Sequence, residues 1–239
     1  MTFTGKTALV TGGSRGIGRA VVERLAAGGA RVVFTYRQDA EAAAELAARL
    51  PGTVAVRADQ SGLDSLDAMF APVGDGLDIL VNNAAAGGGG PIAELTADEF
   101  DRVMTVNAKV PLLAVRRAAE LMPDGGRIVN ISTLNTVLPA PGLVLYCASK
   151  AALEQVTAVA ARELGPRGIT VNTVSPGATD TDLFHSTNPP DAAARCAAMT
   201  ALQRLGRPAD VAAVVAFLAG PDAAWITGQN IRATGGLLL

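Results

Sequence analysis

The sequence is poor in residues that bind metals or form disulfides, and this scarcity excludes several classes of protein. Its 239 residues include one histidine, His185, and two cysteines, Cys147 and Cys196. A structural zinc site needs several histidine, cysteine or carboxylate ligands, and a small secreted domain needs paired cysteines. We therefore expect no metal site, no disulfide framework and a reducing, cytoplasmic location.

The chain also lacks a strong excess of charge and a long apolar run. It has 20 lysine and arginine residues against 22 aspartates and glutamates, which gives a net charge of −2. This balance leaves no basic patch for nucleic acid or for an anionic membrane surface. The longest apolar stretch near the C-terminus, 211–220, is about half of a membrane span, and the N-terminus has no signal-peptide pattern. We therefore expect no nucleic-acid partner and no membrane partner.

What the sequence does have is a regular alternation of apolar β-branched runs and alanine-rich stretches. The alternation predicts βαβ units with right-handed crossovers. We therefore expect an α/β fold in which 1–239 form one domain, a Rossmann-type doubly wound parallel sheet of about seven strands with helices on both faces. The predicted strands are 7–11, 31–36, 53–58, 77–82, 127–131, 170–175 and 230–233, and the predicted helices are 16–27, 40–50, 63–70, 97–121, 147–164 and 209–219.

One segment breaks this alternation. Residues 180–190, "DTDLFHSTNPP", are polar and contain prolines, and they lead into a short helical stretch at 192–202. A long insertion between a strand and the last helix is often functional. We therefore predict a substrate lid around 180–202; the alternative is a plain surface loop.

The segment "TGGSRGIG" at 11–18 places four glycines directly after an apolar strand. At the first strand-to-helix turn of a βαβ fold, free amides and the helix dipole favour an anion. Glycines there allow a pyrophosphate to approach the backbone. We therefore predict a dinucleotide phosphate loop with contacts from Gly12, Ser14, Arg15, Gly16, Ile17 and Gly18; the alternative is a structural turn.

The end of the second predicted strand favours NADP over NAD. An NAD site usually places an acid there to bind the ribose 2′-hydroxyl. Here Tyr36 ends the strand and Arg37 follows it, and Arg15 lies in the glycine loop. Two guanidinium groups suit a 2′-phosphate. The expected cofactor is therefore NADP (NADPH), although Arg37 as an ordinary surface charge is the alternative, and Asp39 nearby weakens the case.

Tyr146 and Lys150 stand four residues apart at the start of a predicted helix. Residues i and i+4 share a helix face, so the phenol and the ammonium can share one site. A nearby cation stabilises a phenolate and lowers the pKa of the phenol. The pair therefore predicts a tyrosine acid–base group activated by a lysine.

Five segments occur in order along the chain: "TGGSRGIG", "ILVNNA", "VNAK", "YCASK" and "VSPGATDT". Together they resemble the short-chain dehydrogenase/reductase family over essentially the whole chain. Within that family the sequence is most similar to the 3-oxoacyl-[acyl-carrier-protein] reductases and related ketoreductases.

The resemblance implies roles for individual residues. Tyr146 matches the family's proton donor, Lys150 the residue that lowers its pKa and holds the nicotinamide ribose, and Asn107 an asparagine that supports a helix distortion and a proton-relay water. The further cofactor contacts that it implies are Asp59 and Gln60 beside the adenine, Asn83 after the fourth strand, and Thr179 and Thr181 at the nicotinamide amide.

The family's catalytic serine is replaced here. It usually stands 13 residues before the tyrosine, and that position is Thr133, with Ser132 one residue earlier. Adjacent residues on a strand point to opposite faces, so one of these hydroxyls faces the substrate. We favour Thr133 as the donor to the developing oxyanion, and Ser132 is the alternative.

These residues lead us to expect an NADPH-dependent ketoreductase. It would reduce a carbonyl, either of a 3-oxoacyl thioester or of a polyketide or related ketone, by hydride transfer with a tyrosine proton donor. The alternatives are an NAD(P)-dependent alcohol or polyol dehydrogenase working oxidatively and a non-catalytic NADP-binding sensor. The partner is a small-molecule carbonyl substrate, free or carrier-bound, and the resemblance implies a homotetramer or homodimer.

Overall fold

The computed structural model describes residues 2–74 and 76–237, and a parallel sheet organises them. The strands are β1 (Thr7–Val10), β2 (Arg31–Tyr36), β3 (Thr53–Arg57), β4 (Ile79–Asn82), β5 (Arg127–Ile131), β6 (Thr170–Pro176) and β7 (Asn230–Ala233). Their order across the sheet is β3-β2-β1-β4-β5-β6-β7. This is the expected Rossmann-type doubly wound sheet, and the strand order reverses between β1 and β4.

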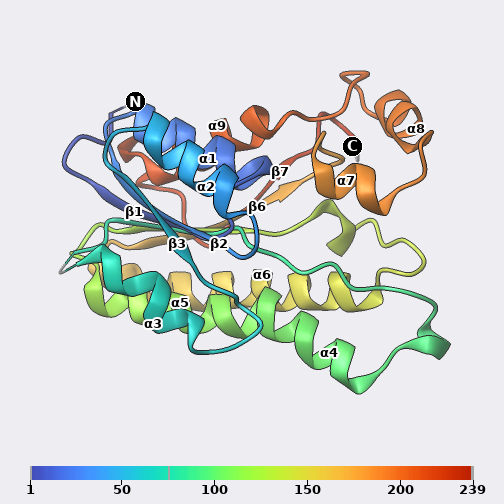
Figure 1. Ribbon diagram of the computed structural model, residues 1–239, viewed down its shortest axis with the longest axis horizontal. Coiled ribbons are helices and arrows are strands. Elements are labelled where there is room, and N and C mark those ends of the chain that lie inside the picture. The colour runs from blue at the N-terminus through green and yellow to red at the C-terminus, as the bar shows by residue number, and fades with distance from the viewer. Residues whose placement is uncertain (1, 75, 238–239) are drawn as a thin grey trace.

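Helices cover both faces of the sheet, as Figure 1 shows. One face packs on α1 (Gly16–Ala27), α2 (Ala40–Arg49) and α9 (Pro208–Ala219). The other packs on α3 (Ser65–Phe70), α5 (Val110–Leu121) and α6 (Val144–Leu164). Alternate strand residues serve the two layers: Val10 and Phe34 face the first, and Leu9 and Val33 the second. Both faces are therefore apolar, as buried parallel strands require.

The remaining elements lie around this core. The α-helices are α4 (Ala97–Met104), α7 (Asp182–Thr187) and α8 (Ala192–Met199), and η3 (Thr105–Lys109) is a π-helix between α4 and α5. The 3₁₀ turns are η1 (Ala71–Val73), η2 (Ile92–Glu94), η4 (Leu134–Thr136), η5 (Gly165–Arg167) and η6 (Pro221–Ala223). In the stretches 2–74 and 76–237, no helix is long and apolar enough to span a bilayer.

A buried chain of polar side chains holds α6 against the sheet. Asn82 on β4 donates to Asn130 on β5 at 2.9 Å, and Asn130 donates to Thr157 on α6 at 2.9 Å. The hydroxyls of Thr157 and Thr173 on β6 lie 2.8 Å apart. Burying a polar group without a hydrogen-bond partner is energetically unfavourable. These linked hydrogen bonds therefore give α6 a definite position on the sheet.

Several predicted elements differ from the observed ones by one to three residues at an end, and two segments differ in kind. The helix predicted over 97–121 is divided into α4, η3 and α5, because the side chain of Asn107 bonds outside its own helix and the i→i+4 ladder widens there. The loop predicted over 180–190 contains α7, which Thr181 caps by accepting from the Phe184 amide.

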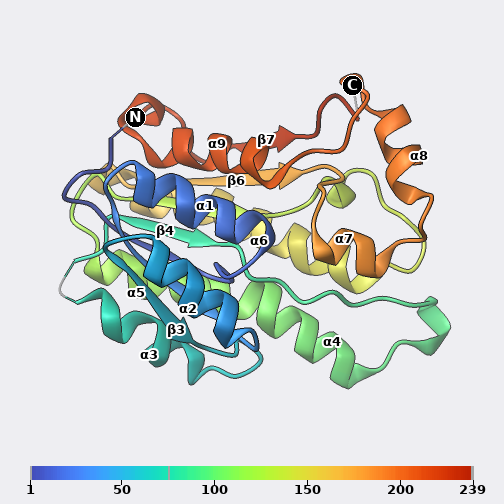
Figure 2. The same ribbon diagram turned by 45° about the horizontal axis from the view of Figure 1, so that its top comes forward.

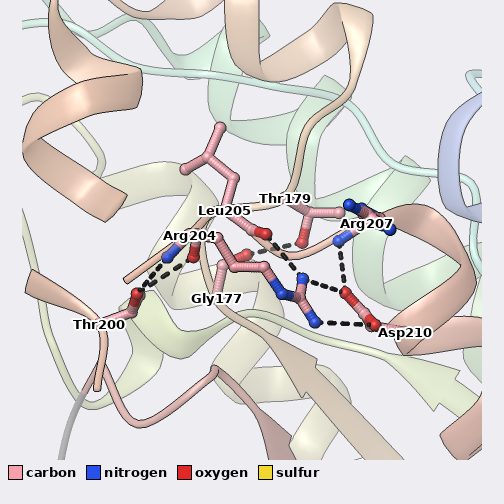
Figure 3. Close-up of polar contacts among 7 residues, drawn as sticks. All are labelled: Gly177, Thr179, Thr200, Arg204, Leu205, Arg207 and Asp210. Atoms are coloured by element: carbon pink, nitrogen blue, oxygen red, sulfur yellow. Dashed lines mark hydrogen bonds and ion pairs between the residues drawn. The ribbon is translucent and has the colours of Figure 1, made fainter. Parts of the chain in front are cut away.

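The segment after α8 is fastened to the start of α9, as Figure 3 shows. Arg204 donates to both carboxylate oxygens of Asp210, at 2.6 and 3.1 Å. Asp210 also accepts from the Arg207 amide at 2.7 Å. Thr179 and Gly206 form a parallel bridge. Residues 180–202 therefore leave and rejoin the body at neighbouring points, and Figure 2 places α7 and α8 beyond the end of the sheet toward which β7 points.

We expect Gly18→Ala to destabilise the fold, because a Cβ at residue 18 would lie 2.1 Å from the Gly12 carbonyl oxygen. Overpacking of this kind costs about 1–3 kcal/mol in free energy of unfolding, measurable by urea denaturation. Gly165→Ala is the control, because a Cβ there meets nothing within 4 Å. Equal losses in the two variants would contradict the close packing of the loop.

Candidate active site

The glycine loop joins β1 to α1 and leaves the start of the helix open. Gly12 and Gly16 have φ angles of 66° and 55°, a region that favours glycine. The N-cap of α1 is Arg15, whose side chain makes no capping hydrogen bond, and the first turn of α1 has no acidic residue. The first amides of α1 are thus available to an anion, and the helix dipole favours one there.

Asn83, at the end of β4, holds this loop in place. Its Nδ2 donates to the backbone oxygens of Thr11 and Gly12 at 2.9 and 3.1 Å. The Thr11 hydroxyl in turn accepts from the amides of Asn83 and Ala84 at 2.9 and 3.0 Å. The Asn83 side chain is therefore engaged with the loop backbone, beside the predicted phosphate site.

Basic side chains gather where β2 and β3 end. Tyr36 and Arg57 are register partners, and Arg57 Nε donates to the Arg37 carbonyl at 3.4 Å. Both arginines are exposed. A hydrogen bond from the Ser61 amide lowers the pKa of Asp59, and the charges of Arg37 and Arg57 add to that lowering. Two arginines thus lie within electrostatic reach of Asp59, although sequence reasoning identified only Arg37.

Other predicted cofactor residues occupy the same end of the sheet. Thr181 lies over the glycine loop, because a Cβ at Gly16 would be 3.4 Å from its Cγ2. Thr179 is buried and donates to the Gly177 carbonyl at 2.9 Å. Gln60 is also buried, and its Oε1 has no hydrogen-bond partner among the described residues. Ser14 is buried, whereas Arg15 is exposed and Ile17 packs against the core.

Tyr146 lies in the first turn of α6, and its phenol is near the Thr133 hydroxyl, just after β5, which acts to lower the pKa of the phenol. The Thr133 hydroxyl donates to Asn135 Oδ1 at 3.1 Å and accepts from the Asn135 amide at 3.2 Å. Asn135, which sequence reasoning missed, therefore fixes the orientation of the hydroxyl that faces Tyr146.

Ser132 points the other way. Its hydroxyl donates to Glu154 Oε1 on α6 at 2.6 Å. Its amide continues the β5–β6 ladder by donating to the Val174 carbonyl at 2.8 Å. Alternation along the extended backbone thus gives the two neighbouring hydroxyls different partners, Thr133 to Tyr146 and Ser132 to Glu154.

Lys150 is fully buried, and its Nζ donates to the Ile131 carbonyl at 2.7 Å. Burial lowers its pKa to about 8, and the charge of Glu154 opposes this lowering. An ammonium in this environment is costly unless it is hydrogen-bonded and compensated. The carbonyl of Ile131 and the carboxylate of Glu154 supply these two requirements.

The pKa of Tyr146 departs from the sequence-based expectation. We expected Lys150 to lower it, but burial raises it above its ordinary value, and the nearby Thr133 hydroxyl only partly offsets that effect. The expectation is wrong in direction because desolvation of the phenol raises its pKa more than Thr133 lowers it, and the Lys150 ammonium donates instead to the Ile131 carbonyl on β5.

Asn107, inside η3, connects the π-helix to α6. Its Oδ1 accepts from the Ala86 amide at 2.8 Å, and its Nδ2 donates to the Ala86 carbonyl at 2.9 Å and to Ser149 Oγ at 3.0 Å. Ser149 donates to the Tyr146 carbonyl at 2.8 Å. Hydrogen bonds therefore link Asn107 through Ser149 to the backbone of Tyr146 at the start of α6.

The chain is similar over nearly its whole length to a family model and to several known proteins. Residues 12–238 match a family model described as "Enoyl-(Acyl carrier protein) reductase". The cyclic-di-GMP-binding biofilm dispersal mediator protein of Escherichia coli K12 is 44% identical over 229 residues, which are 95% of this chain and 94% of that protein.

Two solved ketoreductases share the fold closely. The angucycline C-6 ketoreductase LanV, with NADP bound, is 43% identical with a TM-score of 0.93, covering 99% of this chain and 97% of its own. The reductase LugOII, described as catalysing keto-reduction at C1 in lugdunomycin biosynthesis, is 44% identical with a TM-score of 0.93, and the match covers 100% of both chains.

Proposed function

The chain belongs to the short-chain dehydrogenase/reductase family of oxidoreductases, and from this premise we propose that it is an NADPH-dependent ketoreductase. The observation that carries the proposal is the arrangement at the end of β5 and the start of α6. There a buried ammonium, a phenol and a threonine hydroxyl lie together beside an open helix N-terminus.

The residues around the loop fit NADPH. The uncapped start of α1 suits the pyrophosphate, and a Cβ at Gly12 would already lie 3.0 Å from Ala84 Cα, so the loop has no room for a larger residue. Arg15 and Arg37 are free of ion pairs with acids among the described residues, which suits them to a 2′-phosphate. LanV, a solved relative, carries NADP.

NADPH, when bound, supplies the hydride; the chain supplies the proton and holds the carbonyl. In our proposal the Tyr146 hydroxyl donates its proton to the carbonyl oxygen. The Thr133 hydroxyl turns its one proton from Asn135 Oδ1 to the same oxygen as the charge of that oxygen develops. Lys150 stabilises the phenolate that Tyr146 becomes. Asn107 keeps the start of α6 in place beside the end of β5.

The raised pKa of Tyr146 supports the reductive direction. A phenol whose pKa lies above its ordinary value is protonated at neutral pH, and this is the form that a proton donor requires. An alcohol or polyol dehydrogenase working oxidatively would instead need the phenolate. We therefore favour reduction over the oxidative alternative.

The proposed substrate is an apolar ketone of the polyketide or 3-oxoacyl class. Apolar side chains are exposed around the predicted lid and the loop after β5, which suits a hydrophobic ligand: Val137, Leu183, Met199 and Leu202. LanV is described as an angucycline C-6 ketoreductase, and LugOII as catalysing keto-reduction at C1 during lugdunomycin biosynthesis. A panel of aromatic ketones and 3-oxoacyl thioesters with NADPH tests this choice.

The same panel addresses the sensor alternative. The Escherichia coli relative is described as binding cyclic-di-GMP, so a nucleotide-binding role without turnover is the competing function. NADPH binding without its consumption by any ketone or thioester would favour that reading and contradict ours.

We also propose assembly into a homotetramer or homodimer through α4, α5 and α6. These helices present exposed apolar side chains on one side of the molecule, which suits a subunit interface: Phe100, Leu112 and Val159.

We expect Tyr146→Phe to lower the turnover number by about 10²–10⁴-fold, because the general acid is lost. NADPH affinity, measured by fluorescence titration, should stay within a few-fold of wild type. Retention of wild-type turnover would remove Tyr146 from the reaction.

Thr133→Val and Ser132→Ala separate the two candidate hydroxyls. Loss of an oxyanion donor should lower the turnover number of Thr133→Val by about 10²-fold or more. Ser132→Ala should lose less than about tenfold, because that hydroxyl faces Glu154. The reverse order of losses would assign the role to Ser132.

We expect Arg37→Ala to reduce the NADPH-over-NADH ratio of kcat/KM by about tenfold or more, since a hydrogen bond to a charged phosphate is lost. Arg24→Ala, another exposed arginine, is the matched control. An unchanged ratio in Arg37→Ala would place the phosphate contact elsewhere.

A further inference from the structure

Glu154 is a carboxylate behind the active site that no step above uses. It lies on α6 four residues after Lys150 and eight after Tyr146, so the three side chains share one helix face. Three hydroxyls from two other segments approach its Oε1: Ser132 at 2.6 Å, Thr136 at 2.9 Å and Ser175 at 3.5 Å. A half-buried carboxylate that accepts hydrogen bonds from several hydroxyls is held in one position.

The contacts of Glu154 join the segments that carry the reacting groups. Ser132 directly follows β5 and precedes Thr133, and Thr136 ends η4, the turn that comes after Thr133. Ser175 belongs to β6, the neighbour of β5 in the sheet. Glu154 therefore fastens α6, with Tyr146 and Lys150, to the backbone that presents Thr133.

We propose that Glu154 is a positioning residue of the active site: its carboxylate keeps the buried Lys150 side chain in the ammonium form and holds Ser132 away from the reacting face. The first part follows from the spacing on α6, where Glu154 stands one turn after the buried Lys150 on the same helix face. The second follows from the short Ser132–Glu154 hydrogen bond.

The groups around Lys150 leave Glu154 as the controlling charge. On α6 its titratable neighbours are Tyr146 and Glu154, with Cys147 beside Tyr146. The segments β5, η4, β6 and η3 face this region with neutral groups: the Ile131 carbonyl, the hydroxyls of Ser132, Thr133, Thr136 and Ser175, and the amide of Asn107.

The sign of the effect follows from this arrangement. Burial lowers the pKa of Lys150 to about 8, and the Glu154 charge opposes that lowering. Removing the charge therefore lowers the pKa further, so that Lys150 loses its proton closer to neutral pH. Because a neutral amine stabilises the Tyr146 phenolate less well, the activity should then fall at a lower pH than in wild type.

Glu154→Gln tests the proposal without changing the size of the side chain. The chain has three lysines, Lys6, Lys109 and Lys150, so NMR of protein labelled with ¹³C at lysine Cε follows each one through a pH titration. Lys150→Arg assigns the signal of residue 150. Loss of the negative charge one helical turn away should lower the pKa of Lys150 by about one unit.

Glu163→Gln is the matched control, because Glu163 is an exposed glutamate on the same helix. It should leave the Lys150 titration unchanged. Equal pKa values of Lys150 in wild type and Glu154→Gln, or equal shifts in the two glutamine variants, would overturn the proposal. Should Glu154→Gln fail to fold, the comparison is repeated with Glu154→Asp and Glu154→Asn. These two side chains are equally short, and only the first carries a charge.

A second test measures the pH dependence of ketone reduction, and this test rests on the proposed function. The NMR titration of Lys150 does not. In NADPH-dependent ketone reduction, the alkaline fall of kcat/KM should move to lower pH by about one unit in Glu154→Gln and stay in place in Glu154→Asp. A shifted Lys150 titration without ketone turnover in wild type would contradict the ketoreductase and leave the role of Glu154 standing. Ketone turnover with the same pH profile in Glu154→Gln and Glu154→Asp would contradict the role of Glu154.

Discussion

The hydrogen bond from Lys150 to the Ile131 carbonyl is the contact on which the proposed active site depends. It places a positive charge inside the protein, where an unpaired ammonium would be strongly unfavourable. It also joins α6 to the last residue of β5, so the phenol of Tyr146 and the hydroxyl of Thr133 meet. The buried polar chain through Asn130 and Thr157 sets the distance between that helix and the sheet. Chemistry and packing are thus maintained by the same few bonds.

The sheet order explains why this cluster lies next to the glycine loop. Where the order reverses between β1 and β4, the loops after these strands diverge and leave space at the carboxyl ends. The loop after β1 provides open amides, and Asn83 after β4 fixes their position. The π-helix η3 brings Asn107 to the same end, where it ties the backbone at Ala86 to the start of α6. Charge, amides and hydroxyls therefore converge although they come from distant parts of the chain.

Much of this could be predicted from the sequence, because strands buried on both faces leave near-continuous apolar runs. The bounds of β2, β5, β7 and α1 agree with the predicted ranges. The division of 97–121 was not visible in the apolar pattern; it depends on bonds between Asn107 and Ala86, which lies 21 residues earlier. The helix α7 was missed because its polar composition resembles a loop.

The raised pKa of Tyr146 was missed because spacing along a helix reveals a neighbouring charge but not the loss of water around the phenol. Glu154 carried a signal, its position four residues after Lys150, but its hydroxyl donors come from other segments.

The most direct test of the account is a crystal structure of the protein with NADP and the alcohol product of a ketone that it reduces. The account predicts that the carbinol oxygen accepts or donates hydrogen bonds with both Tyr146 Oη and Thr133 Oγ1, while Ser132 stays bonded to Glu154. A carbinol oxygen bound to Ser132, or a Tyr146 hydroxyl turned away from the nicotinamide, would contradict it.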